Sequence, residues 1–270
     1  MSAAGFSLKG HLPRDAGRGA PAIVLRSARE IDQLRQAGRI VATVLDALGA
    51  AIAPGMTTAD LDAMAHRLIR AAGAVPTFKG YHGFPASICV SVNDEVVHGI
   101  PGPRQLLPGD IVACDVGATL DGYIGDGART FALPPVAAET ERLLAVTAAA
   151  LAAGIAAATP GQRVGDISHA VQSLVEAAGY SVVRRYCGHG VGTTMHEEPQ
   201  VPNHGLPGHG PRLRAGMVIA VEPMVNAGGY DVEVAANGWT VTTLDRSLSA
   251  HFEHTIAVTE QGEARVLTFP

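Results

Sequence analysis

The pattern of hydrophobic and polar positions predicts two helices at the start of the folded region. Ser27 and Glu30 have the spacing of a capping box, and an apolar run of helical period follows them up to a Pro-Gly pair. A second helix is expected after Thr58, with its apolar residues on one face. The chain before Ser27 has no apolar period and is rich in Gly, Arg and Pro, so residues 1–26 are expected to form a flexible extension.

The remaining chain alternates between strand and helix patterns. Strands are predicted over residues 86–93, 110–132, 181–185, 217–223, 239–243 and 251–258. Helices are predicted over residues 138–158 and 164–178. The order helix, helix, strands occurs twice, which indicates an α+β fold. We expect one domain, residues 27–270, made of two pseudo-symmetric halves (about 27–135 and 136–270) around a shared cleft.

Composition and charge exclude several classes of protein. The chain has 270 residues, of which 47% are hydrophobic and 17% charged, as is ordinary for a folded soluble enzyme. A formal net charge of -5 argues against a protein that binds nucleic acid or an anionic membrane by general attraction. The N-terminus lacks the apolar core of a signal peptide, and the alanine-rich run at residues 143–158 is expected to be too short to span a membrane.

Cysteine usage points to a reducing compartment. Cys89, Cys114 and Cys187 are far apart, odd in number and without CxxC spacing, so neither a disulfide framework nor a zinc ribbon is predicted. A cytoplasmic protein is the expectation that fits best.

Two aspartates are predicted to share one face of a hairpin. An Asp-Gly pair at residues 121–122 is a hairpin signal, and a two-residue loop there places Asp115 opposite Ala128. Asp126 then lies two positions from the residue opposite Asp115, so the two carboxylates are diagonal neighbours at roughly 7–8 Å or less. A three-residue loop would overturn this register. Taken alone, such a pair is as well explained by turn capping and solvation.

Three further residues are unusual for their settings. Glu222 ends one strongly apolar run and Glu253 lies inside another, where glutamate is rarely buried unless it is paired or bound to metal. His189 stands between glycines that let backbone and ligand approach closely. Together with the two aspartates, these residues match two divalent cations in charge and ligand type. The mixed oxygen and nitrogen ligands favour Mn, Fe, Co or Zn over Mg or Ca.

With these residues assembled, the chain resembles the type I methionine aminopeptidases of bacteria. The resemblance extends from about Ile31 to the C-terminus and is carried by the stretches GYHGFPASICVSVNDEVVHGIP, GDIVACDVGATLDGYIGDGARTF, YCGHGVGTTMHEEPQV, GMVIAVEPMVNAG and NGWTVTTLDRSLSAHFEHTIAVTE. It implies the pseudo-twofold pita-bread fold, a curved antiparallel sheet backed by helices around a central metal cleft. It also implies removal of the initiator methionine from nascent polypeptides, preferentially when the second residue is small.

The resemblance implies a ligand role for each of the five residues. In the family pattern Asp126 and Glu253 bridge both ions. Asp115 binds one ion, and His189 and Glu222 bind the other. The expected cofactors are therefore two divalent metal ions.

The resemblance also implies three catalytic residues. Glu222 would act as proton shuttle between water and the leaving amine. His196 would hydrogen-bond the scissile carbonyl oxygen, and His98 the peptide nitrogen next to it.

Methionine selectivity requires a close-fitting apolar pocket with polarizable contacts. The positions that the family uses for this pocket hold Phe78, Tyr81, His82, Cys89, Met195 and Trp239. Phe78 and Met195 depart from the expected Cys and Phe of the bacterial pattern, which leaves the size of the pocket open.

The resemblance extends to a monovalent cation site and to partners. Backbone oxygens near Asn93, Glu95 and Ser249 would hold the cation. The expected partners are the N-termini of nascent polypeptides, with the chain acting as a monomer. A ribosome contact through the N-terminal extension stays open.

Three alternatives share parts of this pattern. An Xaa-Pro peptidase on the same scaffold would have all five ligands, but those relatives carry an additional N-terminal domain. Type II methionine aminopeptidases carry a helical insert for which the chain after His196 has no room. A non-catalytic pita-bread binding module would be expected to lack ligands, and none of the five is missing.

Overall fold

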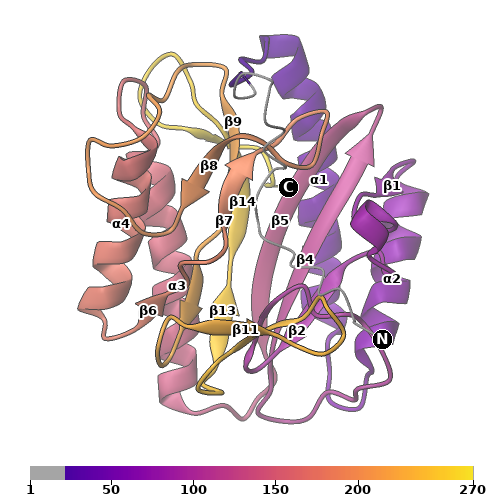
Figure 1. Ribbon diagram of the computed structural model, residues 1–270. Helices are drawn as coiled ribbons and strands as arrows, with labels where there is room; N and C mark the ends of the chain where they lie inside the picture. Colours follow the sequence, from indigo (N-terminus) through magenta and orange to yellow (C-terminus); the bar gives the residue numbers. More distant parts are fainter. Residues whose placement is uncertain (1–21, 270) are drawn as a thin grey trace, which may run out of the picture.

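The computed structural model of the chain, which describes residues 22–269, contains a nine-stranded sheet with one pair of helices beside each of its two halves (Figure 1). The first half of the chain contributes α1 Ala28–Ala51, α2 Thr58–Ala71, β1 Val75–Pro76, the 3-10 helix η1 Tyr81–Gly83, β2 Cys89–Val92, β3 Glu95–Val97, β4 Ile111–Leu120 and β5 Tyr123–Ala132. The second half contributes α3 Ala138–Ala157, α4 Val164–Ala177, β6 Ser181–Val182, β7 Cys187–Gly190, β8 Glu197–Pro202, β9 Val218–Val221, β10 Met224–Asn226, β11 Val232–Val234, β12 Val241–Thr243, β13 Ser249–His251, β14 Glu253–Ala257 and β15 Arg265–Val266.

The predicted order of helices and strands is confirmed, and the caps explain where the first two helices begin. The Ser27 side chain accepts a hydrogen bond from the Glu30 N–H, and the Glu30 carboxylate accepts one from the Ser27 N–H, so the predicted capping box is present. An equivalent box, formed by Thr57 and Asp60, opens α2. Both helices bury their apolar faces against β4 and its neighbours, within one core cluster.

The main sheet has the order β1-β4-β5-β14-β9-β7-β8, with β2 pairing with β4 and β15 with β14. Strands from the first half occupy one side of this order and strands from the second half the other, and they meet where β5 pairs with β14. In Figure 1, α1 and α2 lie beside β4 and β5, while α3 and α4 lie on the opposite side of the molecule. The line between the halves therefore passes through the centre of the sheet.

Helix α3 has the predicted extent, but it corrects the expectation that the apolar run is too short to span a membrane. Its 20 residues, Ala138–Ala157, are long and apolar enough to cross a membrane, and α3 is the one helix of the described chain with this property. The helix packs closely against α4 and contacts β9, β10, β13 and β14. Its buried positions include Leu143, Leu151 and Gly154. These contacts are those of a core helix.

One predicted strand is wrong in its extent. Residues 251–258 do not form a single strand: β13 ends at His251 and pairs with β10 in a three-stranded sheet, whereas β14 begins at Glu253 and lies in the main sheet. The chain changes sheets at Phe252, whose N–H donates to the Pro223 carbonyl. Hydrophobic alternation continues across this step, so the pattern alone does not reveal it.

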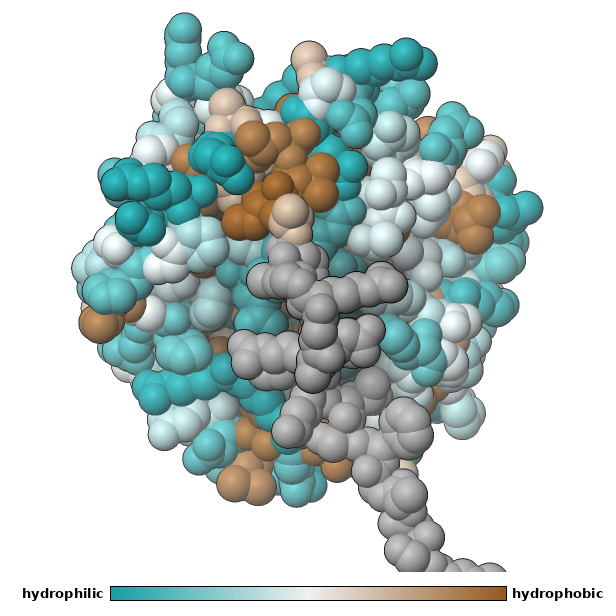
Figure 2. All heavy atoms as spheres, turned by 45° about the horizontal axis from the view of Figure 1, so that its top comes forward, coloured by the Kyte–Doolittle hydropathy of each residue, from teal (hydrophilic) through white to brown (hydrophobic). Residues whose placement is uncertain are grey.

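The segment just before α1 lies on the domain. Ile23 packs against a core cluster of the second half, and the Arg26 N–H donates to the Gly216 carbonyl at 2.7 Å. Val24 and Leu25 keep 42% and 44% of their surface exposed. Figure 2 shows a hydrophobic area where the described chain begins. Residues 1–21, the greater part of the predicted extension, lie outside the described residues.

Candidate metal centre and substrate pocket

The register of neighbouring strands brings the acidic residues together. The β4–β5 hairpin turns at residues 121–122, so that Asp115 lies opposite Ala128, which confirms the predicted register. Glu253 of β14 also lies opposite Ala128, from the other side of β5. Asp126 is two residues from Ala128 and faces the same way. One patch of sheet thus carries three carboxylates from three adjacent strands.

Glu222 is brought to this patch by the pairing of β9 with β14. Val221, the last residue of β9, lies opposite His254, so the residue that follows it, Glu222, lies opposite Glu253. Only 2% of the Asp126 surface and 2% of the Glu253 surface are exposed. The five residues come from both halves of the sheet, and they meet near its centre.

Burial raises the pKa of each of these carboxyl groups, and mutual repulsion adds to this for three of them. For Asp115, burial acts first and the charge of Asp126 second. Burial is again the main cause for Glu222, followed by Asp126 and Asp115. For Glu253, burial is followed by the charges of Asp126, Glu222 and Asp115. Burial raises the pKa of Asp126 to about 7. Without a cation, the site cannot hold all four groups in ionised form at neutral pH.

His189 presents a bare ring nitrogen to the carboxylates. Its Nδ1 lies 2.9 Å from the Gly190 carbonyl oxygen and must donate to it, so Nε2 carries no proton in the neutral ring. That nitrogen lies 3.6 Å from Asp126 Oδ2 and 3.5 Å from Glu222 Oε1. Burial lowers the pKa of His189 to about 4, which favours the neutral ring. A lone pair and two carboxylate oxygens at this distance repel one another unless a cation lies between them.

The backbone around His189 explains why glycines flank it. The pairing of β7 with β8 shifts register between Gly188 and Gly190, which is a bulge of the kind that redirects a side chain. A Cβ added at Gly188 would lie 2.3 Å from the Ala220 carbonyl oxygen, and one at Gly190 would lie 2.3 Å from the Glu198 carbonyl oxygen. Only glycine permits these approaches.

The donor set fits divalent cations. The ligand atoms of Asp126, His189 and Glu253 all lie within 4.8 Å of one another. Asp115 Oδ1, Asp126 Oδ1 and Glu253 Oε1 are buried without a hydrogen-bond partner. Within residues 22–269, the recorded ion pairs of these carboxylates are with histidine and none is with lysine or arginine. Buried acidic oxygens that lack a protein counter-charge are those expected of metal ligands.

Two more of the predicted residues, His196 and His98, lie beside this cluster. The rings of His196 and His189 have centroids 4.3 Å apart. Desolvation lowers the pKa of His196 to about 2, with contributions from His189 and then His98, although part of the residue is exposed. Burial also lowers the pKa of His98 to about 4. Both histidines are therefore neutral and can each offer one N–H.

An apolar cluster lies next to the histidines. It contains five of the six residues predicted for methionine binding, namely Phe78, Tyr81, Cys89, Met195 and Trp239. The sixth, His82, is exposed and lies edge-on to Tyr81 with ring centroids 4.3 Å apart. The cluster is lined on its sheet side by Cys89, directly opposite Asp115.

Sequence reasoning missed several residues of this region. Phe84 packs edge-on against Trp239 with ring centroids 5.1 Å apart, and Ile100 contacts the same cluster. The signal for Phe84 was present, since it is an apolar residue in a turn that also holds Tyr81. His251 was also missed: it is buried, and its Nε2 lies 3.9 Å from Glu222 Oε2.

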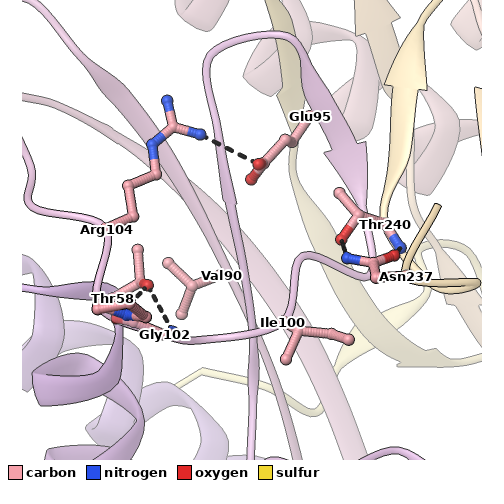
Figure 3. A pocket seen from close by; sticks show the side chains of 9 residues that line it. Thr58, Val90, Glu95, Ile100, Gly102, Arg104, Asn237 and Thr240 are labelled. Carbon is pink, nitrogen blue, oxygen red and sulfur yellow. Dashed lines mark hydrogen bonds and ion pairs between the residues drawn. The ribbon is translucent and has the colours of Figure 1, made fainter. Parts of the chain in front are cut away.

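A cavity of about 460 Å³ borders this cluster at Ile100 (Figure 3). Its walls include Val90, Ile100 and Thr240, and the Glu95–Arg104 ion pair of 3.0 Å spans one side. The Glu95 carboxylate also accepts a hydrogen bond from the Val92 N–H. None of the five predicted metal ligands lines this cavity.

With this geometry described, comparison with known proteins assigns the class. The sequence profile described as Metallopeptidase family M24 matches residues 32–260, which is most of the chain. The chain therefore belongs to metallopeptidase family M24.

Within that family, proteins of high sequence identity to this chain are methionine aminopeptidases. Methionine aminopeptidase 1 of Bacillus subtilis is 52% identical over 240 residues, which cover 89% of this chain and 97% of the relative. The crystal structure of methionine aminopeptidase from Rickettsia prowazekii superposes with a TM-score of 0.90 at 43% identity, covering 92% of this chain and 100% of that one. These matches place the chain with the bacterial type I methionine aminopeptidases and confirm the pita-bread fold.

The scaffold is shared more widely. Prolidase from Pyrococcus furiosus has a TM-score of 0.74 at 20% identity, and this likeness shows the fold alone. The match covers 92% of this chain but 66% of the prolidase. The difference in length agrees with the expectation that Xaa-Pro peptidases carry additional chain.

Proposed function

We propose that this chain removes the initiator methionine from nascent polypeptides, preferentially when the second residue is small. The observation that carries the proposal is the position of His189 and the buried, unpartnered carboxylates directly beside an apolar cluster that contains Met195 and Cys89. The names of the similar proteins support the same reaction.

The five clustered residues would hold two divalent ions, with Mn, Fe, Co and Zn as candidates. Asp115, Asp126, His189, Glu222 and Glu253 would be the ligands of these ions. Bound divalent ions would lower the pKa of water toward neutrality and stabilise negative charge on the substrate carbonyl oxygen. The chain's own residues would perform the remaining steps.

Glu222 would accept a proton from the attacking water and pass it to the leaving amine. Its carboxylate lies within the cluster, with Oε1 3.5 Å from His189 Nε2. His196 would donate its N–H to the carbonyl oxygen of the scissile bond, and His98 would hydrogen-bond the adjacent peptide nitrogen. The pocket formed by Phe78, Tyr81, His82, Cys89, Met195 and Trp239 would receive the methionine side chain.

We extend the proposal to the setting of the reaction. The enzyme would act in the cytoplasm as a monomer, on chain ends emerging from ribosomes, and a monovalent cation would bind backbone oxygens near Asn93, Glu95 and Ser249. In support, these three residues lie together: the Ser249 N–H donates to the Asn93 carbonyl at 2.9 Å, and Glu95 begins β3 two residues later.

One experiment separates this proposal from its rivals. Purified protein with added Mn or Co is incubated with Met-Gly-Met-Met and, in parallel, with an Xaa-Pro peptide, and the products are weighed by mass spectrometry. Release of the first methionine alone is expected. Cleavage of the Xaa-Pro peptide instead would support an Xaa-Pro peptidase. Cleavage of neither by metal-loaded protein would support a non-catalytic binding module.

A further inference from the structure

The hydroxyl of Tyr81 contacts His196, a residue far away in the sequence. Tyr81 Oη and His196 Nδ1 are 2.7 Å apart, which is a short hydrogen bond. The two rings are tilted by 34°, with centroids 5.5 Å apart. Pocket packing requires only the ring of Tyr81, so the hydroxyl needs an explanation of its own.

The loop that carries Tyr81 is closed by its own backbone hydrogen bonds. The Gly80 N–H donates to the Phe84 carbonyl at 2.8 Å, and the Phe84 N–H donates to the Tyr81 carbonyl at 2.9 Å. The Tyr81 N–H donates to the Phe78 carbonyl at 3.0 Å. Gly80 has φ 87°, a left-handed conformation that favours glycine. The turn therefore fixes where the hydroxyl points.

The protons at this contact allow two arrangements. A neutral imidazole has one N–H and one bare nitrogen, and Nδ1 of His196 is the nitrogen that faces the Tyr81 hydroxyl. Burial raises the pKa of Tyr81, so its hydroxyl keeps its proton. Either the hydroxyl donates to Nδ1 and Nε2 carries the imidazole proton, or Nδ1–H donates to the hydroxyl oxygen and Nε2 is bare.

Only the first arrangement leaves His196 able to donate through Nε2. A carbonyl oxygen that gains negative charge needs an N–H directed at it, and a bare nitrogen would repel it. We propose that Tyr81 is a positioning residue whose hydroxyl donates to Nδ1 and so holds His196 in the tautomer with its proton on Nε2. The catalytic consequence rests on the function proposed above, whereas the tautomer itself does not.

The tautomer can be read without any substrate. The protein is labelled with ¹⁵N-histidine and loaded with diamagnetic Zn²⁺, and protonated and bare ring nitrogens are distinguished by their ¹⁵N chemical shifts. The His196 signals are assigned by their loss in His196→Ala. A proton on Nε2 is expected in the wild type, with a mixture of tautomers in Tyr81→Phe. A proton on Nδ1 in the wild type overturns the proposal.

Kinetics test whether Tyr81 acts through His196. Tyr81→Phe keeps the ring, so the KM for Met-Gly-Met-Met should change little while kcat falls at least about tenfold, a fraction of the loss expected for a whole oxyanion donor. In a His196→Ala background the same change should have less than about a twofold effect, because coupled residues are not additive. An equal loss in both backgrounds contradicts the proposal.

Tyr180→Phe is the matched control, because it also removes a hydrogen-bonded hydroxyl. Tyr180 donates to Glu139 in the helical layer and is no part of the cleft. Its kcat should match that of the wild type. If the metal-loaded wild type fails to release methionine, the proposed function fails, while the ¹⁵N shifts still decide the tautomer.

Discussion

Glu197 and the four central carboxylates (Asp115, Asp126, Glu222 and Glu253) are acidic groups in the same region of the molecule. They differ in the source of the positive charge that balances them. Glu197, the residue after His196, accepts two hydrogen bonds from the Arg26 guanidinium, at 2.6 and 2.7 Å. It also accepts from the N–H groups of Thr193 and Thr194. The four central carboxylates have no such partner among the described arginines and lysines, and three of their oxygens are unsatisfied. Burial alone does not identify a metal ligand; burial without a protein cation does.

Glu222→Gln should have the largest effect, a loss of turnover, because it removes the group proposed to move the proton. The amide keeps one oxygen donor but cannot accept the proton from water. We expect kcat to fall about 10³-fold, within the range attributed to general acid–base catalysis. Metal content, measured on the same sample, should fall much less. Unchanged turnover would refute the shuttle role of Glu222.

Removal of metal should lower the stability of the fold, because the central carboxylates lose their counter-charge. The Arg26–Glu197 pair should stay intact. Adding Mn²⁺ to metal-free protein at a thousandfold excess over its Kd should stabilise the fold by about 4 kcal/mol. The metal-free protein should also respond to pH. Asp126 has a folded pKa of about 7 against 3.8 for the free group, so its stabilising contribution is complete below about pH 4 and is lost as pH rises toward 7.

Thermal unfolding at several pH values, with and without metal, tests this prediction. The metal-free curve should decline in stability from pH 4 to pH 7, and Mn²⁺ should oppose that decline. A metal-free protein that gains stability over the same range would contradict the assignment of raised pKa values to the cluster.

The effect of Arg26→Ala on stability should be the same with and without metal. Arg26 is 8% exposed and Glu197 13%, so loss of the guanidinium leaves a buried carboxylate without its cation. We expect a loss of about 3 kcal/mol in the free energy of unfolding, measured by urea denaturation. Arg35→Ala is the control, since its partner Asp32 is 51% exposed. That control should cost less than about 1 kcal/mol.

Phe78→Leu should have the smallest effect, because it changes the pocket and leaves both charged sets unchanged. Phe78 packs against Gly117 of β4, where an added Cβ would lie 2.5 Å from its ring. A smaller side chain leaves space beside the methionine group, and KM for methionine peptides should rise about tenfold. Steady-state kinetics measure this change, with kcat expected to stay within about threefold of the wild type. A lower KM would show that Phe78 obstructs the pocket.

Local signals were sufficient to predict much of the fold and the placement of two of the five proposed ligands. The capping box at Ser27 and the Asp-Gly turn at residues 121–122 are short-range features, so the helix start and the hairpin register follow from a few residues. The same register is what places Asp115 and Asp126 on one face. These predictions needed no knowledge of the other half of the chain.

The rest depends on contacts between distant segments. Strand β7 is glycine-rich and β8 is polar, so neither shows the alternation by which strands are predicted. Glu253 and Glu222 face Asp126 only because β14 pairs with both β5 and β9. From the sequence, the grouping of these residues in one site could be predicted only through the resemblance to a family. The Arg26–Glu197 contact joins residues 171 apart, and nothing near either residue signals it.

The position of Arg26 has a practical consequence for anyone who shortens or fuses this protein. Helix α1 begins at Ala28, so a design that starts at the first helical residue keeps every helix and strand yet discards the guanidinium that holds Glu197. Such a protein would have the right outline and a loosened loop beside His196. The functional boundary of the folded unit is therefore set by one ion pair and lies ahead of the first turn of helix.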